Sequence, residues 1–171
     1  MVDAETPGLT QQLTMTKHPQ QLTTIAFELR SVGRTGYYHS SMERTGKERV
    51  FSDISHAVIG CAIAVHRELG PGLLEVAYRK CLARELELAG IPFEEERPLP
   101  VVYRDERVEC GYRADLVVAN KLIVELKAVA TLLPIHEAQI LSYLKLSGLR
   151  YGLLINFNVE RLAKGLRSFV L

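Results

Sequence analysis

The sequence lacks the features that mark several large classes of protein. Its three cysteines lie far apart and form no CxxC pair, so we interpret them as reduced, mostly buried thiols. No apolar run approaches the length of a membrane span, and the N-terminus has no basic-then-apolar leader. These absences predict a cytoplasmic protein that makes no contact with a membrane.

Several reaction classes are also disfavoured, because their motifs do not occur. The chain has no Walker-type phosphate loop and no GxGxxG, HExxH or GxSxG sequence. Its formal net charge is only +1, so composition gives no general support for nucleic-acid binding, and any basic surface must be local. One C-terminal set of basic residues either follows a phosphate backbone or forms an ordinary charged surface: Lys145, Arg150, Arg161, Lys164 and Arg167.

The chain does contain enough apolar material for one domain with a core. Its 171 residues are 47% hydrophobic and 24% charged, as in soluble globular proteins. Residues 1–48 are instead rich in Thr, Gln, Ser, Gly and Arg, and we expect them to form a disordered or poorly packed extension. The folded domain is therefore expected at residues 49–171.

Hydrophobic periodicity and turn residues predict the elements of that domain. Helices are expected from Ser52 or Asp53 to 69, over 73–89 and over 134–147, and strands over 93–97 continuing at 101–103, 108–118, 122–129 and 151–157. Residues from 159 onward alternate ambiguously between helix and strand. Pro98 and Pro100 mark the first strand as an edge strand or a broken one.

The order of these elements predicts the fold class. It runs helix, helix, three antiparallel strands, helix and strand, which indicates an α/β fold of the α+β sandwich type, a mixed central sheet flanked by helices. The strand that follows the third helix should pair in parallel inside the sheet, because a crossover helix precedes it.

The segment from Arg113 to Lys127 reads as a β-hairpin with charged residues in an apolar setting. Glu125 and Lys127 are two residues apart, so in a strand they point to the same face. A three-residue loop, 119–121, would place Asp115 directly opposite Glu125, whereas a two-residue loop would send the two carboxylates to opposite faces. We predict the odd-length loop.

Two carboxylates that can hold a hard divalent cation beside a lysine suit chemistry on a phosphodiester. Glu75, in the first turn of its helix, is a candidate third carboxylate that approaches the metal from the helix. The alternatives are ordinary: Glu125 and Lys127 as a surface ion pair, and Glu75 as a residue that complements the helix dipole.

Polar residues on the predicted helices extend this candidate site. His136, Gln139 and Tyr143 fall on one face of the third helix, where Gln139 could hold a carboxylate, the lysine or a substrate phosphate. The alternative is an ordinary solvated face. Tyr78, three residues after Glu75, is either a core aromatic with a hydrated hydroxyl or part of the site.

Taken in order, these motifs resemble the PD-(D/E)XK nuclease superfamily. Asp115, then Glu125-Leu-Lys127, then Gln139-Ile-Leu-Ser-Tyr143 is similar to its RecB-like form with a QxxxY helix. The segment Gly72-Leu-Leu-Glu75-Val-Ala-Tyr78 resembles the signature of the GxxExxY protein family, a branch of that superfamily. The resemblance covers roughly residues 52–171.

The resemblance implies a restriction-endonuclease-like core and a role for each motif. Asp115 and Glu125 would bind Mg²⁺, often assisted by a helical carboxylate, here Glu75. Lys127 would position or activate the attacking water and stabilise the developing charge. Gln139 and Tyr143 would support the site and the substrate.

The leading hypothesis is a Mg²⁺-dependent nuclease or nuclease-like phosphodiesterase that hydrolyses nucleic acid with metal-activated water. The alternative is a non-catalytic module that keeps the fold and binds nucleic acid, a nucleotide or a protein. A third possibility is a structural partner in a complex, for which an apolar patch around Leu132, Leu133 and Phe169 would be the sign.

Overall fold

The computed structural model describes residues 46–109 and 111–171. Three α-helices and one short 3₁₀ helix are present among them: α2 (Gly46–Leu69), α3 (Glu75–Leu88), α4 (Pro134–Ser147) and η1 (Leu162–Gly165). The strands are β1 (Phe93–Pro98), β2 (Val101–Tyr103), β3 (Glu106–Val108), β4 (Arg113–Val118), β5 (Leu122–Lys127), β6 (Tyr151–Asn156) and β7 (Leu166–Val170).

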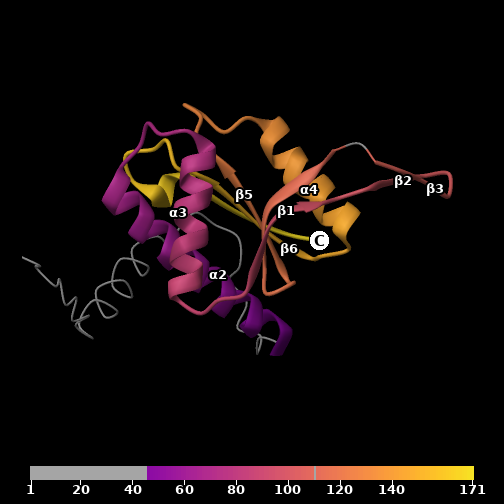
Figure 1. Cartoon of the computed structure of the whole chain (residues 1–171), viewed down its shortest axis with the longest axis horizontal. Helices are drawn as coiled ribbons and strands as arrows, with labels where there is room; N and C mark the ends of the chain where they lie inside the picture. Colours follow the sequence, from indigo (N-terminus) through magenta and orange to yellow (C-terminus); the bar gives the residue numbers. More distant parts are fainter. Residues whose placement is uncertain (1–45, 110) are drawn as a thin grey trace, which may run out of the picture. The chain divides into compact units, whose positions relative to one another are not determined.

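A five-stranded mixed sheet in the order β1-β4-β5-β6-β7 forms the centre of this region (Figure 1). The pairs β1–β4, β4–β5 and β6–β7 are antiparallel, and β5–β6 is parallel. The predicted antiparallel order and the parallel strand after the crossover helix are both confirmed. So is the edge position of β1, which contains Pro98 and therefore lacks one backbone donor.

Helices cover both faces of the sheet. Side chains of α2 and α3, such as Val58, Ala62 and Leu82, pack with Leu116, Val124 and Leu153 on one face. On the other face, Ile140 and Leu144 of α4 pack with residues such as Val117, Ile123 and Leu154. Figure 1 shows α2 and α3 on one side of the strands and α4 on the other. The predicted sandwich of helices around a mixed sheet is confirmed.

The boundaries of α4 and β6 also agree with the sequence. Pro134 is the first residue of α4, where its missing N–H costs no hydrogen bond. Gly148 follows the last turn with a φ of 70°, a left-handed conformation that glycine adopts without strain.

The largest departures from the predicted boundaries concern α2 and the expected strand 108–118. Helix α2 begins at Gly46 rather than at Ser52 or Asp53, because good helix formers such as Lys47, Glu48 and Arg49 continue it beyond the apolar pattern. The last three residues of the expected extension therefore start α2, while residues 1–45 lie outside the described part of the chain. The expected strand 108–118 is divided by Gly111, whose φ is 74°.

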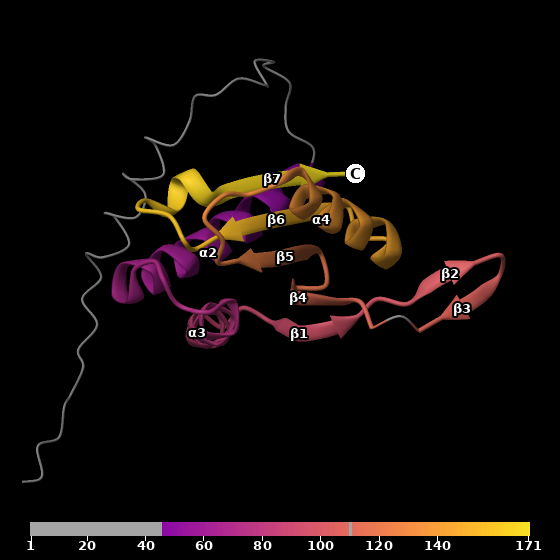
Figure 2. The ribbon, with the colours of Figure 1, turned by 90° about the horizontal axis from the view of Figure 1, so that it is seen from above.

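Because of that division, β2 and β3 form a separate two-stranded sheet, which we call the arm (Val101–Val108). Figures 1 and 2 show the arm extending away from the five-stranded sheet. The ambiguous C-terminal segment becomes η1 followed by β7, which pairs with β6 at the second edge of the sheet. None of the described helices is both long and apolar enough to cross a lipid bilayer.

We predict that the close approach of η1 to β6 is a requirement of the fold. A Cβ added at Gly165 would overlap the backbone carbonyl of Asn156. Gly165→Ala should therefore lower the free energy of unfolding by about 1–3 kcal/mol, because β6 would have to shift. As a control, Gly60→Ala in α2 meets no atom within 4 Å. It should raise the stability by about 0.5–1 kcal/mol. Urea unfolding of both variants tests this, and equal effects would contradict it.

Candidate active site

The β4–β5 hairpin has the odd-length loop that the sequence predicted. Val118 pairs with Leu122, so the connecting loop is residues 119–121, and two of these residues have φ near 50°. The register continues through the pair Leu116–Val124. Asp115 and Glu125, the next residues along each strand, consequently stand opposite each other on the same face of the sheet.

The side chain of Asp115 bonds to β5 just beyond the last backbone pair of the two strands. Its Oδ2 atom accepts a hydrogen bond of 2.8 Å from the backbone N–H of Leu126. This bond fixes the carboxylate beside β5 at the point where backbone pairing of the two strands stops. The other oxygen, Oδ1, lies 3.6 Å from Nη1 of Arg79 in α3.

Glu125 and Lys127 are buried together on β5, with 2% and 9% of their surfaces exposed. The ammonium Nζ of Lys127 donates a hydrogen bond of 2.6 Å to Oε1 of Glu125. The other oxygen, Oε2, is buried and has no hydrogen-bond partner in the described part of the protein. Such an atom is costly to bury, so its environment is incomplete as it stands.

Glu75, in helix α3, lies close to the same lysine. It is the first residue of α3, and its Oε2 lies 3.9 Å from Nζ of Lys127. The turn before α3 is held by Tyr78, whose hydroxyl donates to the carbonyl of Gly70 at 2.6 Å and accepts from the N–H of Leu73 at 3.1 Å. The ring of Tyr78 is fully buried and stacks on Phe157. Tyr78 thus supports the turn that positions Glu75.

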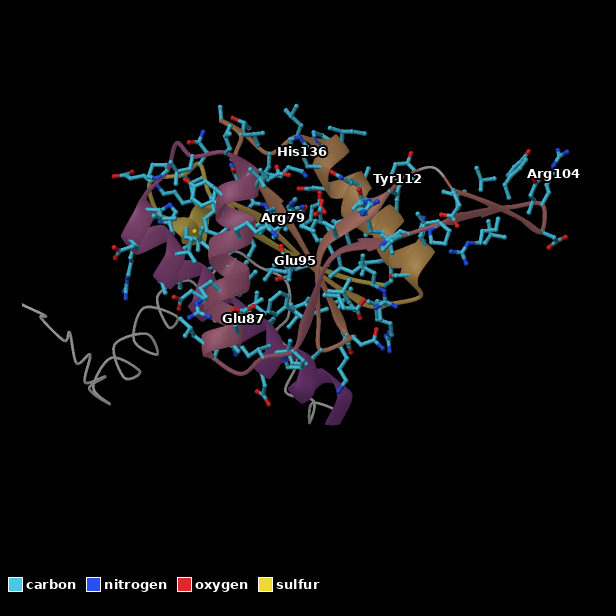
Figure 3. The ribbon with its side chains drawn as sticks, viewed as in Figure 1. Arg79, Glu87, Glu95, Arg104, Tyr112 and His136 are labelled. Atoms are coloured by element: carbon cyan, nitrogen blue, oxygen red, sulfur yellow. The ribbon has the colours of Figure 1, made fainter. Side chains whose placement is uncertain are left out.

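Arg79 is a site residue that the sequence reasoning missed. Besides Asp115, its Nη1 contacts Oε1 of Glu96 at 3.0 Å, and its Nε lies 4.0 Å from Glu95. Figure 3 shows Arg79 and Glu95 between α3 and the strands. A cavity of about 80 Å³ lies beside Arg79, Glu75 and Asp115. The available signal was its position four residues after Glu75, which places both on one face of the helix.

Asn156 is a second residue that the motifs did not reveal. It is 2% exposed at the end of β6, paired in register with Lys127. Its side chain accepts from the N–H of Val129 at 3.0 Å and donates to the carbonyl of Val129 at 2.7 Å. Asn156 therefore fixes the chain where it leaves β5. A single amide within an otherwise apolar strand was the signal for it.

On α4, the predicted polar face divides into two parts. His136 holds the helix start, because its Nδ1 accepts a hydrogen bond of 3.0 Å from the N–H of Leu133. Gln139 donates through Nε2 to the hydroxyl of Tyr143 at 2.8 Å. Burial raises the pKa of Tyr143, the hydrogen bond from Gln139 lowers it, and the charges of Glu125, Lys127 and Asp115 also act on it. The members of the C-terminal basic set lie on different elements: Lys145 on α4, Arg150 in the α4–β6 connection, Arg161 just before η1, Lys164 in η1 and Arg167 in β7.

Comparison with known families agrees with this geometry. The sequence model of the PD-(D/E)XK nuclease superfamily matches residues 52–169. The chain belongs to this superfamily. Neither the comparison with curated proteins nor the comparison with solved structures found a match. The matched range contains all the expected site residues, and the mixed sheet between helices is consistent with the restriction-endonuclease-like fold of PD-(D/E)XK nucleases.

The surroundings of the candidate site disfavour the charged forms of its three carboxyl groups. Burial raises the pKa of Glu125 from its ordinary 4.5 to about 7, and the charge of Asp115 adds to that rise against the opposing effect of Lys127. Burial likewise raises the pKa of Asp115 and of Glu75. Burial alone would lower the pKa of Lys127. The negative charges of Glu125, Glu75 and Asp115 outweigh this effect, so the pKa of Lys127 lies above its ordinary value.

These observations test whether the site fits a divalent cation. Within residues 46–109 and 111–171, no three His, Cys, Asp or Glu side chains form a ready-made group for a metal. Lys127 and Arg79 lie between the expected ligands and already contact Glu125, Glu75 and Asp115. The donor chemistry nevertheless fits, because Asp115, Glu125 and Glu75 supply hard oxygen donors, and Oε2 of Glu125 has no hydrogen-bond partner among the described residues. Asp115 and Glu125, with Glu75 beside them, are the residues suited to hold Mg²⁺ or Mn²⁺.

The raised pKa of Glu125 predicts a pH-dependent stability of the metal-free protein. Since the folded state binds this proton more tightly than the unfolded chain, stability falls as pH rises from about 4.5 to about 7. Between these pH values the unmodified protein should lose on the order of 3 kcal/mol of its free energy of unfolding. We expect Glu125→Gln to be free of this pH-dependent loss. Urea unfolding in EDTA at several pH values measures it, with the exposed arm residue changed in Glu106→Gln as control. A difference between Glu125→Gln and the unmodified protein that stays constant with pH would contradict the prediction.

A second prediction concerns metal binding itself. Mg²⁺ or Mn²⁺ should stabilise the folded protein by about 2.7 kcal/mol when the free ion is at one hundred times its dissociation constant. Asp115→Asn should lose this stabilisation, and Glu106→Gln should keep it, because Glu106 lies on the arm. Thermal unfolding with and without the ion tests both. If Asp115→Asn were stabilised as much as the unmodified protein, Asp115 would not be a ligand.

Proposed function

We propose that this protein is a metal-dependent nuclease that hydrolyses phosphodiester bonds of nucleic acid. The observation that carries the proposal is the group of half-buried Asp115 with buried Glu125 and Lys127, held on one face of β4 and β5 in a PD-(D/E)XK superfamily member. Burying these charges is unfavourable, and clustered groups with perturbed pKa values are typical of functional sites. We also infer that the segment from Gly72 to Tyr78 places the chain in the GxxExxY branch.

In this proposal the residues have distinct roles. Asp115 and Glu125 hold Mg²⁺ or Mn²⁺, and Glu75 assists from the start of α3. A divalent ion there supplies activation of water and stabilisation of charge at phosphorus. Lys127, whose ammonium is fixed by its bond to Glu125, orients the attacking water and donates to the developing negative charge. Gln139 and Tyr143 border the site and position the substrate.

Cleavage assays test this assignment directly. We expect the full chain to cleave labelled single- or double-stranded DNA or RNA with Mg²⁺ or Mn²⁺, and not with EDTA. Lys127→Ala should lower the rate at least about 100-fold, because a donor to the transition state is lost. Lys121→Ala, an exposed lysine in the loop of the same hairpin, is the matched control and should leave the rate unchanged.

Removing Lys127 leaves Glu125 unpaired, so the fold of each variant must be checked by thermal unfolding. Asp115→Asn, which keeps the size of the side chain, provides a second inactive variant. Lys127→Ala that folds and cleaves at the unmodified rate would refute the role of Lys127. A folded protein that cleaves none of these substrates with either ion would instead favour a non-catalytic binding module.

A further inference from the structure

A groove of about 550 Å³ lies between α4 and the base of the arm. Ile135, Ser142 and Leu146 of α4 form one side, and Val101 and Tyr112 form the other. Figure 3 shows Tyr112 beside α4 where the chain returns from the arm. The volume falls within the range of roughly 300–1,000 Å³ that is usual for small-molecule sites.

The groove shares two residues with the candidate active site. Gln139 and Tyr143, which are hydrogen-bonded to each other, belong to its lining. The hydroxyl of Tyr143 also lies within the electrostatic influence of Glu125, Lys127 and Asp115. A group bound in the groove would therefore contact Gln139 and Tyr143, two residues of the candidate site.

Tyr112 offers an accessible aromatic surface on a fixed backbone. Its carbonyl accepts a hydrogen bond of 2.8 Å from the N–H of Leu99, which is buried. Its side chain is nevertheless 49% exposed, and its ring centre is 6.2 Å from that of Tyr143 at an angle of 57°. A planar ring could stack on the exposed face of Tyr112 without any rearrangement of the core.

The charge of the groove complements a nucleotide. Its described lining residues include one charged group, the ammonium of Lys145, and no carboxylate. Apolar walls, an aromatic face and a single cation match a base attached to an anionic phosphate. A paired base within a duplex is stacked on both sides and cannot enter such a groove unless it leaves the helix.

We propose that this groove receives an unpaired nucleobase stacked on Tyr112, and that the substrate is therefore single-stranded nucleic acid or a single-stranded segment of a duplex. The proposal rests on the proposed nuclease function, since it names the substrate class of the same site. Lys145 contacts the adjoining phosphate, and Gln139 and Tyr143 lie between the bound base and the carboxylates.

The chain contains no tryptophan, so a single introduced tryptophan reports on the groove alone. In Tyr112→Trp, we expect single-stranded DNA or RNA oligonucleotides to quench the fluorescence, whereas a blunt DNA hairpin with a closed loop of minimal length does not. Tyr103→Trp is the matched control, because Tyr103 is also exposed but lies on the arm outside the groove. All titrations contain EDTA, so that binding is measured without cleavage.

Affinity measurements complete the test. Tyr112→Ala should weaken single-strand binding roughly 5- to 100-fold, as expected for the loss of one stacked base, and Tyr103→Ala should change it by less than about twofold. Absence of quenching in Tyr112→Trp, or equal affinity of Tyr112→Ala and the unmodified protein for single strands, would overturn the proposal.

The outcomes separate this proposal from the proposed nuclease function. Quenching by single strands in EDTA without cleavage in Mg²⁺ or Mn²⁺ would support the groove and refute the nuclease. Metal-dependent cleavage of a closed duplex at the single-strand rate, unaffected by Tyr112→Ala, would support the nuclease and refute the groove.

Discussion

The buried ion pair of Glu125 and Lys127 is the constraint around which this site is arranged. All six residues of β5 are buried, so water solvates the two charges poorly. Desolvating such a pair costs several kcal/mol, and apolar residues of similar volume often give a more stable protein. The strand at the centre of the sheet therefore keeps two charges that stability does not require. Buried charges that stability does not require are expected where chemistry, rather than folding, determines which residue stands at a position.

The groups that surround this pair come from separate parts of the chain. Asp115 stands on the neighbouring antiparallel strand, Glu75 and Arg79 on α3, and the Gln139–Tyr143 pair on α4. Helices α3 and α4 pack on opposite faces of the sheet, so the site exists only when both layers are assembled. The parallel pairing of β5 with β6 helps to bring these groups together. It requires a crossover after β5, and that crossover contains α4, the helix that carries Gln139 and Tyr143.

The sequence predicted the parts of the structure that depend on local or alternating patterns. The odd loop after Val118 followed from strand periodicity, and the limits of α4 followed from Pro134 and Gly148. The start of α2 was not predicted because it lies before the apolar pattern begins, and the separation of the arm was not predicted because Gly111 was taken to lie inside one strand. Arg79 was missed for a different reason. Its importance lies in contacts with Asp115 and Glu96, 36 and 17 residues further along the chain, which no local motif encodes.

The charge distribution suggests how such a site obtains affinity for a polyanion. The chain as a whole carries a net charge of only +1, so long-range attraction contributes little to binding. Near the reacting groups the carboxylates repel a phosphate, and Lys127 and Arg79 are already engaged with them. A divalent ion neutralises part of this negative charge, but it acts at one phosphate only. In the proposed groove, stacking on Tyr112 would supply affinity that does not depend on charge, for any base and whatever the sequence. Weak steering combined with stacking favours substrates whose bases are exposed over those whose bases are paired.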